Sequence, residues 1–195
     1  MRSIQANIDN LINILSELYF PLSVIGLTET KLKIDQEEIL NINIPHYNFL
    51  SQPSLSNAGG VGVFVKNGIS YSCREDLSSV KEGYESLWIE IQNNAEHNTF
   101  CGIMYRHSHG NLDSFMTHIS TVIENIHHEN KYCVILGDFN LDLLKFESHP
   151  GTNEFLNILI SSYFQPRILQ PIRITDHSAT LIDNIFFNSL EHFDN

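Results

Sequence analysis

The stretch that most constrains the fold spans residues 132–144 and reads Tyr-Cys-Val-Ile-Leu-Gly-Asp-Phe-Asn-Leu-Asp-Leu-Leu. Its first five residues are apolar and partly β-branched, which predicts a strand that is buried on both faces and stops at Gly137. Carboxylate and amide side chains follow this strand at Asp138, Asn140 and Asp142. A buried strand that ends in such groups can hold them rigidly for hydrolysis. The same residues also form ordinary Asx turns, and Gly-Asp-x-Asn by itself leaves both interpretations open.

Length and hydrophobic content predict a single domain with a sizeable core. The chain has 195 residues, of which 42% are hydrophobic, and this is not the composition of a disordered protein. No apolar run is long enough to span a membrane, and the first residues contain no signal-peptide core. Three cysteines, an odd number, lie in or beside apolar stretches at Cys73, Cys101 and Cys133. We therefore expect buried, reduced thiols in an intracellular protein.

The charge of the chain limits how it can meet nucleic acid. A formal net charge of −12 argues against a protein that binds DNA through a broad basic face. It leaves room for an enzyme that meets nucleic acid through a small local patch. A group of carboxylates is also what a hard divalent cation requires.

Hydrophobic periodicity predicts helices outside two sheets. The expected helices are 4–18 with a cap at Ser3, 112–126 with a cap at Asn111, about 153–161, and a weaker one at 35–40. The expected strands are 22–27, 46–50, 59–65, 69–73, 85–91, 99–105, 132–136 and 180–187, with turns at 67–68 and 93–94 and a polar loop at 76–83. Hairpins in the middle of the chain and strand–helix units elsewhere indicate an α/β (α+β) fold.

Three acidic residues share one structural context. Glu29 and Asp138 each follow a predicted strand, and Asp183 lies inside an apolar strand, where an unpaired charge would be costly. Carboxylates at strand ends can converge on one point, and a convergent set attracts Mg²⁺ or Mn²⁺, which support phosphoryl chemistry. Tyr105 and Arg106 end another predicted strand, and both could hydrogen-bond a phosphate.

Seven short motifs along the chain resemble those of the endonuclease/exonuclease/phosphatase superfamily, which includes pancreatic deoxyribonuclease and the abasic-site endonucleases. Within it, the chain is most similar to the endonuclease domain of non-LTR (LINE-type) retrotransposons. Each motif alone is weak, but their common order along nearly the whole chain is specific. The motifs are Arg2-Ser3-Ile4, Leu27-Thr28-Glu29-Thr30, Gly59-Gly60-Val61-Gly62, Glu85-Ser86-Leu87, Tyr105-Arg106, Gly137-Asp138-Phe139-Asn140, and Ser178-Ala179-Thr180-Leu181-Ile182-Asp183-Asn184-Ile185-Phe186.

The resemblance implies a fold, a reaction and a role for each matched residue. The fold would be a deoxyribonuclease I-like four-layer sandwich of two mixed or antiparallel sheets flanked by helices. Glu29 would bind Mg²⁺, with Mn²⁺ as an alternative, and Asp138 would orient or deprotonate the attacking water. Asn140 would support that water and the phosphate, with Arg106 as a further phosphate-binding residue. Tyr105 would hydrogen-bond the scissile phosphate or leaving group, and Asp183 would orient a catalytic histidine.

The implied activity is metal-assisted hydrolysis of DNA that leaves a 3′-hydroxyl. In this family the hydroxyl primes a reverse transcriptase carried by a separate domain, so we expect DNA and a reverse transcriptase domain as partners, no membrane, and a nuclear location where target DNA is found. The family's N-terminal asparagine strand and its final Ser-Asp-His signature have no counterpart between Met1 and Asn195. We therefore expect 1–195 to be a single incomplete domain that lacks the first and last strands.

Two other functions remain open at this stage. The missing catalytic groups favour a non-catalytic remnant of the endonuclease domain. A phosphodiesterase or phosphatase of the same fold could act on a small phosphoester, and the acidic charge agrees with this alternative. The Thr-Leu-Ile-Asp-Asn-Ile-Phe sequence at 180–186 is that of the retroelement branch and favours the endonuclease.

Several residues could be interpreted as functional, but each also has a simpler structural interpretation. His107-x-His109 is expected to be a solvated loop, since no second pair of metal ligands lies nearby. His177 precedes Asp183 and is likewise expected to be a loop residue outside the site. Glu85 either touches the site, as family members suggest, or is a surface residue at the start of a strand.

Two further residue types have conformational explanations. The glycines of 59–62 precede a strand, so they are expected to permit a close backbone approach or a bulge rather than to bind phosphate. Asp142 is expected to be a turn residue.

Overall fold

The computed structural model describes residues 4–32, 42–56, 58–93 and 97–188. The predicted cap at Ser3, the weak helix at 35–40 and part of the turn at 93–94 lie outside the described residues. None of the helices in the described part of the chain is long and apolar enough to cross a lipid bilayer.

The described chain forms three α-helices, one short 3-10 helix and twelve strands. The helices are α1 (Ile4–Glu17), α2 (Leu112–Glu129) and α3 (Pro150–Ser161), with the 3-10 turn η1 at Leu143–Lys145. The strands are β1 (Val24–Thr28), β2 (Tyr47–Gln52), β3 (Val61–Lys66), β4 (Tyr71–Cys73), β5 (Ser79–Lys81), β6 (Tyr84–Ile91), β7 (Thr99–Arg106), β8 (Tyr132–Asp138), β9 (Phe164–Pro166), β10 (Arg173–Ile174), β11 (Ala179–Thr180) and β12 (Asp183–Asn188).

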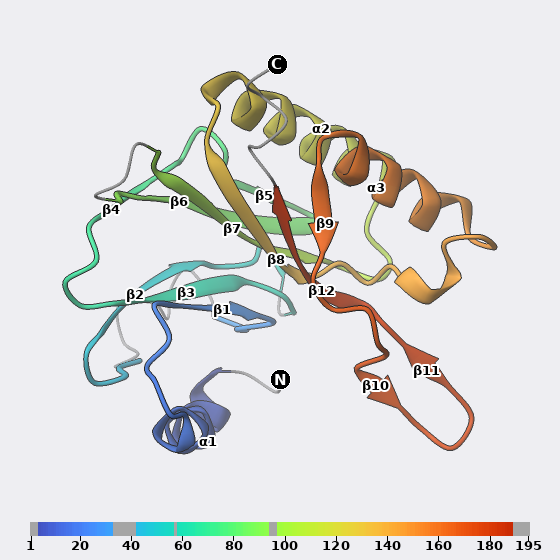
Figure 1. Cartoon of the computed structure of the whole chain (residues 1–195). Helices are drawn as coiled ribbons and strands as arrows, with labels where there is room; N and C mark the ends of the chain where they lie inside the picture. The colour runs from blue at the N-terminus through green and yellow to red at the C-terminus, as the bar shows by residue number, and fades with distance from the viewer. Residues whose placement is uncertain (1–3, 33–41, 57, 94–96, 189–195) are drawn as a thin grey trace.

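These elements stack in four layers, as the resemblance implied (Figure 1). Helix α1 covers the outer face of a three-stranded sheet, ordered β1-β3-β2. This sheet packs on a seven-stranded sheet, ordered β4-β6-β7-β8-β12-β9 with β5 paired to β6. Helices α2 and α3 cover the far face of the larger sheet. The strands β10 and β11 form a separate hairpin that projects from the body of the molecule.

Each interface between layers has its own hydrophobic core. The smaller sheet contributes Val61, Val63 and Val65 to the core between the two sheets, where they meet alternate residues of β6 and β7. The core under α2 and α3 is rich in aromatic rings, and α1 packs on Ile25 and Phe64 of the smaller sheet. Strands covered on both faces cannot show a simple alternation of polar and apolar residues, which explains the continuous apolar runs of β3 and β8.

Strand β8 is longer than its apolar run predicts, because it continues through Gly137 to Asp138. A Cβ atom at residue 137 would overlap the carbonyl oxygen of Met104 on the neighbouring strand β7. Glycine at this position therefore permits pairing rather than ending it. Of all the strand pairs in the described chain, only β7 and β8 are parallel, and helix α2 makes the crossover between them.

The ends of the helices follow ordinary capping chemistry. Asn111 caps α2 by accepting a hydrogen bond from the backbone N–H of Ser114, as predicted, and Asn130 closes the helix in a left-handed conformation. Helix α3 begins at Pro150 rather than near residue 153. The reason is that His149 Nδ1 accepts from the N–H of Thr152 and proline suits the first helical position.

Several predictions about short elements were wrong. The expected polar loop at 76–83 contains the edge strand β5, and β9, β10 and β11 were not predicted because each spans two or three residues. Such strands are too short to show a period in the sequence. Cys101 and Cys133 are buried as expected, but Cys73 is exposed on the edge strand β4.

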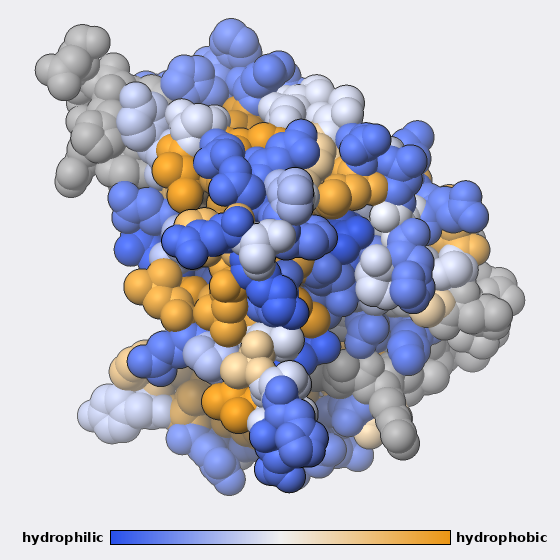
Figure 2. Space-filling view, turned by 90° about the vertical axis from the view of Figure 1, so that its right-hand side faces the viewer, coloured by the Kyte–Doolittle hydropathy of each residue, from blue (hydrophilic) through white to orange (hydrophobic). Residues whose placement is uncertain are grey.

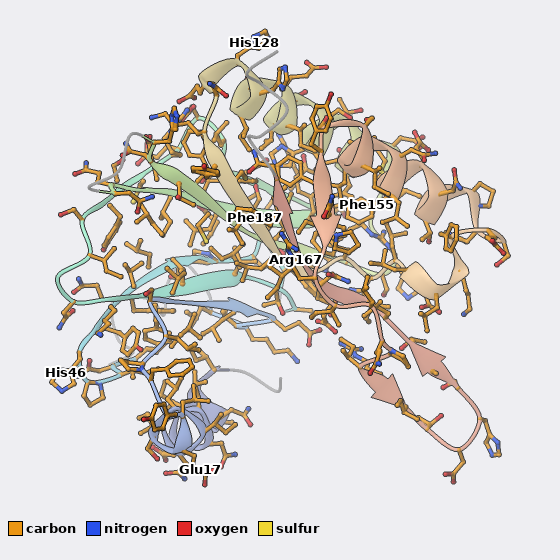
Figure 3. The ribbon with its side chains drawn as sticks, in the orientation of Figure 1. Glu17, His46, His128, Phe155, Arg167 and Phe187 are labelled. Carbon is orange, nitrogen blue, oxygen red and sulfur yellow. The ribbon has the colours of Figure 1, made fainter. Side chains whose placement is uncertain are left out.

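Phe155 lies at the centre of the core under α3, on the side of the helix that faces the sheet (Figure 3). Its ring centroid is 4.9 Å from that of Phe139, 5.8 Å from that of Phe186 and 6.0 Å from that of Phe115. We predict that Phe155→Ala lowers the free energy of unfolding by about 3–5 kcal/mol in urea denaturation, because a cavity remains. Ile160→Ala, on the exposed side of the same helix, should change it by no more than about 0.5 kcal/mol. Equal losses for the two variants would contradict this description of the core.

Candidate active site

Four polar side chains lie in one row across the larger sheet. Glu85 on β6 pairs with Tyr105 on β7, Tyr105 pairs with Asp138 on β8, and Asp138 pairs with Asp183 on β12. Residues directly opposite each other in neighbouring strands point to the same face of a sheet. This face is the one that packs on the smaller sheet, as the burial of Leu87, Ile103 and Tyr105 between the sheets shows. The row therefore lies at one end of the core between the two sheets.

The smaller sheet adds Glu29 to this row. Glu29 follows β1 directly and has a left-handed backbone, with φ 54°. Its carboxylate Oε1 accepts a hydrogen bond of 3.0 Å from the hydroxyl of Tyr105, which links the two sheets. The backbone beyond Glu29 is held by the predicted glycine loop: the N–H of Thr30 donates to the carbonyl of Gly60. A left-handed non-glycine residue costs energy and is common at functional sites.

Asp138 is a buried carboxylate at the centre of this row. Its Oδ1 accepts from the backbone N–H of Asn140 at 3.0 Å, and its Oδ2 lies 3.2 Å from Nη2 of Arg173. Burial raises the pKa of Asp138 to about 6, and the negative charges of Asp183 and Glu29 act in the same direction. Burial also raises the pKa of Asp183, while Arg173 opposes that shift. A proton or a cation is therefore favoured beside Asp138.

Asn140 and Arg106 interlock the loop after β8 with the end of β7. Asn140 is left-handed, with φ 48°, and its amide Nδ2 donates to the carbonyl of Arg106 at 2.6 Å. The buried guanidinium of Arg106 donates in return to the carbonyls of Phe139 and Asn140, at 2.7 and 2.8 Å. This geometry favours a structural role for Arg106, and its predicted phosphate contact finds no support in these bonds.

The amide of Asn140 is only half-buried, which leaves its predicted role open. Asp142 is a turn residue as expected, because its Oδ1 accepts from the N–H groups of Leu144 and Leu181.

Glu85 and His107 form a pair that the sequence did not reveal. Glu85 is fully buried, which excludes the surface interpretation. Its Oε1 accepts from the hydroxyl of Ser54 at 2.5 Å and lies 2.9 Å from Nε2 of His107. The imidazole of His107 also packs edge-on against Tyr105, with ring centroids 4.9 Å apart. His107 is therefore part of the site's surroundings and not a solvated loop residue.

The backbone of Gly59 packs over this pair. A Cβ atom at Gly59 would lie 2.8 Å from the His107 ring and 2.9 Å from Glu85 Oε2, and the φ of Gly59 is +100°. The expectation of a close backbone approach in the glycine motif is thus confirmed. The N–H of Lys31 donates to the carbonyl of Gly59, so the same loop supports both the buried pair and the segment after Glu29.

Arg173 is the second residue that sequence reasoning missed. It begins the hairpin strand β10, and its Nη2 lies 3.2 Å from Asp138 and 3.4 Å from Asp183. The sequence offered only an isolated basic residue in what looked like a connecting loop. His177 lies exposed in the turn of the same hairpin, as expected of a loop histidine.

A cleft of about 610 Å³ opens beside Tyr105 and His107, with Gly83, Ser108 and Asn111 among its other lining residues. Figure 2 shows the end of the molecule that carries the hairpin: hydrophilic side chains cover most of it, and hydrophobic ones appear in small separate patches.

The donor set suits a hard divalent cation. As they are placed, no three His, Cys, Asp or Glu side chains within 4–32, 42–56, 58–93 and 97–188 converge closely enough to hold a metal ion. Glu29, Asp138 and Asp183 nevertheless offer only oxygen ligands, which Mg²⁺ prefers, and Mg²⁺ needs only one or two carboxylates because it keeps several waters. Burial is the main cause of the raised pKa of Asp138, and the negative charges of Asp183 and Glu29 add to it, so positive charge among these carboxylates would be stabilised. The residues present therefore fit Mg²⁺ or Mn²⁺.

Two packed sheets with helices on their outer faces form a deoxyribonuclease I-like fold, and the polar row lies at one end of the core between the sheets. A model of the endonuclease/exonuclease/phosphatase family matches residues 4–192. The chain belongs to this family, whose members are typically nucleases and phosphatases.

Solved structures with the same fold share little sequence with the chain. The endonuclease domain of TRAS1, a telomere-specific non-LTR retrotransposon, is 9% identical with a TM-score of 0.65, over 96% of this chain and 80% of that one. The APE2 catalytic domain of Xenopus laevis is 19% identical with a TM-score of 0.64 over the same shares. The AP endonuclease LMAP of Leishmania major is 13% identical with a TM-score of 0.68, over 96% and 75%. The comparison with curated proteins gave no match.

The raised pKa of Asp138 predicts a dependence of stability on pH. Its pKa is about 6 in the folded protein against an ordinary value of 3.8, so the folded state binds more protons between these values. The free energy of unfolding should therefore fall as pH rises from 4 to 6, by at most about 3 kcal/mol. We predict that Asp138→Asn removes this part of the pH dependence, measured by urea denaturation in EDTA. Asp9→Asn, an exposed residue on α1, should keep the wild-type slope, and identical slopes for all three proteins would contradict the account.

Proposed function

We propose that the chain is the DNA endonuclease domain of a retrotransposon-derived protein, which nicks its target by metal-dependent hydrolysis and leaves a 3′-hydroxyl. The proposal rests on one observation. Tyr105, Asp138 and Asp183 lie side by side on neighbouring strands, and Glu29 of the other sheet accepts a hydrogen bond from Tyr105. Four polar side chains from four separate strand ends meet at one end of the core. Burial of such groups lowers stability, so their convergence points to chemistry.

The residues divide the work of hydrolysis among them. Glu29 would hold Mg²⁺, which supplies positive charge for the developing negative charge of the phosphate. Asp138 accepts a proton from the attacking water, whose oxygen forms a new bond to phosphorus while the bond from phosphorus to the 3′ oxygen breaks. The 3′ oxygen takes a proton from solvent as it leaves and becomes a hydroxyl, and the phosphate stays on the 5′ end of the downstream strand. A carboxylate whose pKa is raised to about 6 is a stronger base than an ordinary one at neutral pH.

Tyr105 acts as a hydrogen-bond donor. Burial and the hydrogen bond to Glu29 both raise the pKa of its hydroxyl, so the phenol keeps its proton. Its single O–H is donated to Glu29 in this structure, and it would turn from Glu29 to donate to a phosphate oxygen or to the leaving oxygen. Asn140 and Asp183 complete the set, with Asp183 paired to Arg173 in this structure.

The setting of the activity follows from the same proposal. A retroelement endonuclease works beside a reverse transcriptase that extends the new 3′-hydroxyl, and it acts in the nucleus where target DNA lies. TRAS1 is named as a telomere-specific element, and its similarity in fold agrees with this setting.

We predict that the protein converts supercoiled plasmid to nicked circles in Mg²⁺ and not in EDTA, and that a DNA polymerase extends the nicks directly. Asp138→Asn should slow nicking by at least about 100-fold, because it removes the group that accepts the proton. Asp113→Asn, an exposed carboxylate on α2, is the matched control and should nick like the wild type. Nicking by Asp138→Asn at the wild-type rate would exclude the proposed site.

The net charge of −12 favours a second candidate, hydrolysis of a small phosphoester, because long DNA is repelled by an acidic surface. The two candidates differ in a direct comparison of plasmid with bis(p-nitrophenyl) phosphate. Faster turnover of the small diester, with no nicking, would support the second candidate. No turnover of either substrate would support a non-catalytic remnant.

A further inference from the structure

The hairpin β10–β11 places the guanidinium of Arg173 beside Asp138 and Asp183 of the polar row. The backbone of this hairpin pairs Arg173 with Thr180, and its turn closes through a hydrogen bond from the N–H of Thr175 to the carbonyl of Ser178. The hairpin projects from the body beside the end of the sheet where β12 begins (Figure 1). Arg173 reaches back from its base to Asp138 and Asp183.

The contacts of Arg173 leave most of its guanidinium available. Both ion pairs are made by Nη2, at 3.2 and 3.4 Å, and 54% of the side chain is exposed. The structure gives Nε and Nη1 no hydrogen-bond partner among the described residues. A guanidinium has five N–H donors in a planar fork that suits phosphate. Ion pairs therefore hold Nη2 of Arg173 in place, while Nε and Nη1 are available to bind a ligand.

The hairpin does not depend on these ion pairs for its form. Backbone hydrogen bonds link Ile172 to Thr180 and Thr175 to Ser178, and the Thr175 hydroxyl accepts from the N–H of Ser178 at 3.0 Å. Ion pairs of a half-exposed arginine contribute little to stability. A purely structural role therefore explains poorly why the guanidinium is directed at Asp138 and Asp183.

We propose that Arg173 is a catalytic residue that binds a non-bridging oxygen of the scissile phosphate through Nε or Nη1, while Nη2 stays on Asp138 and Asp183. This inference rests on the proposed hydrolysis of a phosphodiester. A phosphate that approaches Glu29, Asp138 and Asp183 meets negative charge on every side, so a fixed cation at their edge both attracts it and stabilises the charge that develops on it. Because Asp138 positions the water, the same contact would align the phosphorus with the attacking oxygen.

The test compares Arg173→Ala and Arg173→Lys with Arg167→Ala. Arg167 is an exposed arginine just after β9, and its guanidinium lies 5.3 Å from the centre of the Phe187 ring on β12 (Figure 3). In plasmid nicking with Mg²⁺, we expect Arg173→Ala to lose on the order of 100-fold in kcat/KM and Arg173→Lys to lose less. Arg167→Ala should match the wild type. Added guanidinium chloride, below denaturing concentrations, should restore part of the rate to Arg173→Ala alone.

A binding measurement separates this inference from the proposed function. Inorganic phosphate is titrated into each protein and followed by ³¹P NMR in Mg²⁺, where we expect Arg173→Ala alone to bind phosphate several-fold more weakly. If the wild type cleaves no substrate, the proposed function fails, and the phosphate titration still decides the role of Arg173.

Three results would overturn the assignment. The first is an Arg173→Ala protein that cleaves and binds phosphate within twofold of the wild type. The second is one that cleaves faster, which would show that Arg173 blocks the acidic row. The third is a loss of cleavage with unchanged phosphate binding and no rescue by guanidinium, which would show a structural role.

Discussion

The parallel pairing of β7 with β8 is the constraint on which the rest of the site depends. Its register places Tyr105 opposite Asp138, and a shift by one residue would turn either side chain to the opposite face. Gly137 allows this pairing to reach the end of β8, because any side chain there would meet the backbone of β7. Hydrogen bonds of Arg106 to the loop after β8 then hold the two strand ends together. The polar row is therefore a product of backbone register.

Much of the fold and part of the site could be predicted from the sequence. The three helices, the central strands and the two-sheet architecture follow from apolar periodicity, and Glu29, Tyr105 and Asp138 stood at the ends of strands with clear patterns. The structure places these three residues together, although their catalytic roles stay predictions. Elements of two or three residues, such as β5 and β9, carry too little pattern to be recognised.

The residues that sequence reasoning missed all depend on contacts between distant segments. His107 follows β7 in a loop, and only the fold shows that it pairs with Glu85, whose burial the sequence left open. Arg173 lies in a hairpin that no periodicity predicts, yet it contacts carboxylates 35 and 10 residues away. Ion pairs of this kind are set by tertiary structure, so no local signal could have identified them.

Strand register, as we propose, assembles a metal-dependent centre between the two sheets. The location of a bound cation tests this claim most directly. A crystal of the protein soaked in Mn²⁺ would locate the ion by its anomalous scattering. We predict a peak about 2.0–2.3 Å from the carboxylate of Glu29, on the side that faces Asp138. A peak at His107 and His109 instead, or no peak at the acidic row at saturating Mn²⁺, would contradict the account.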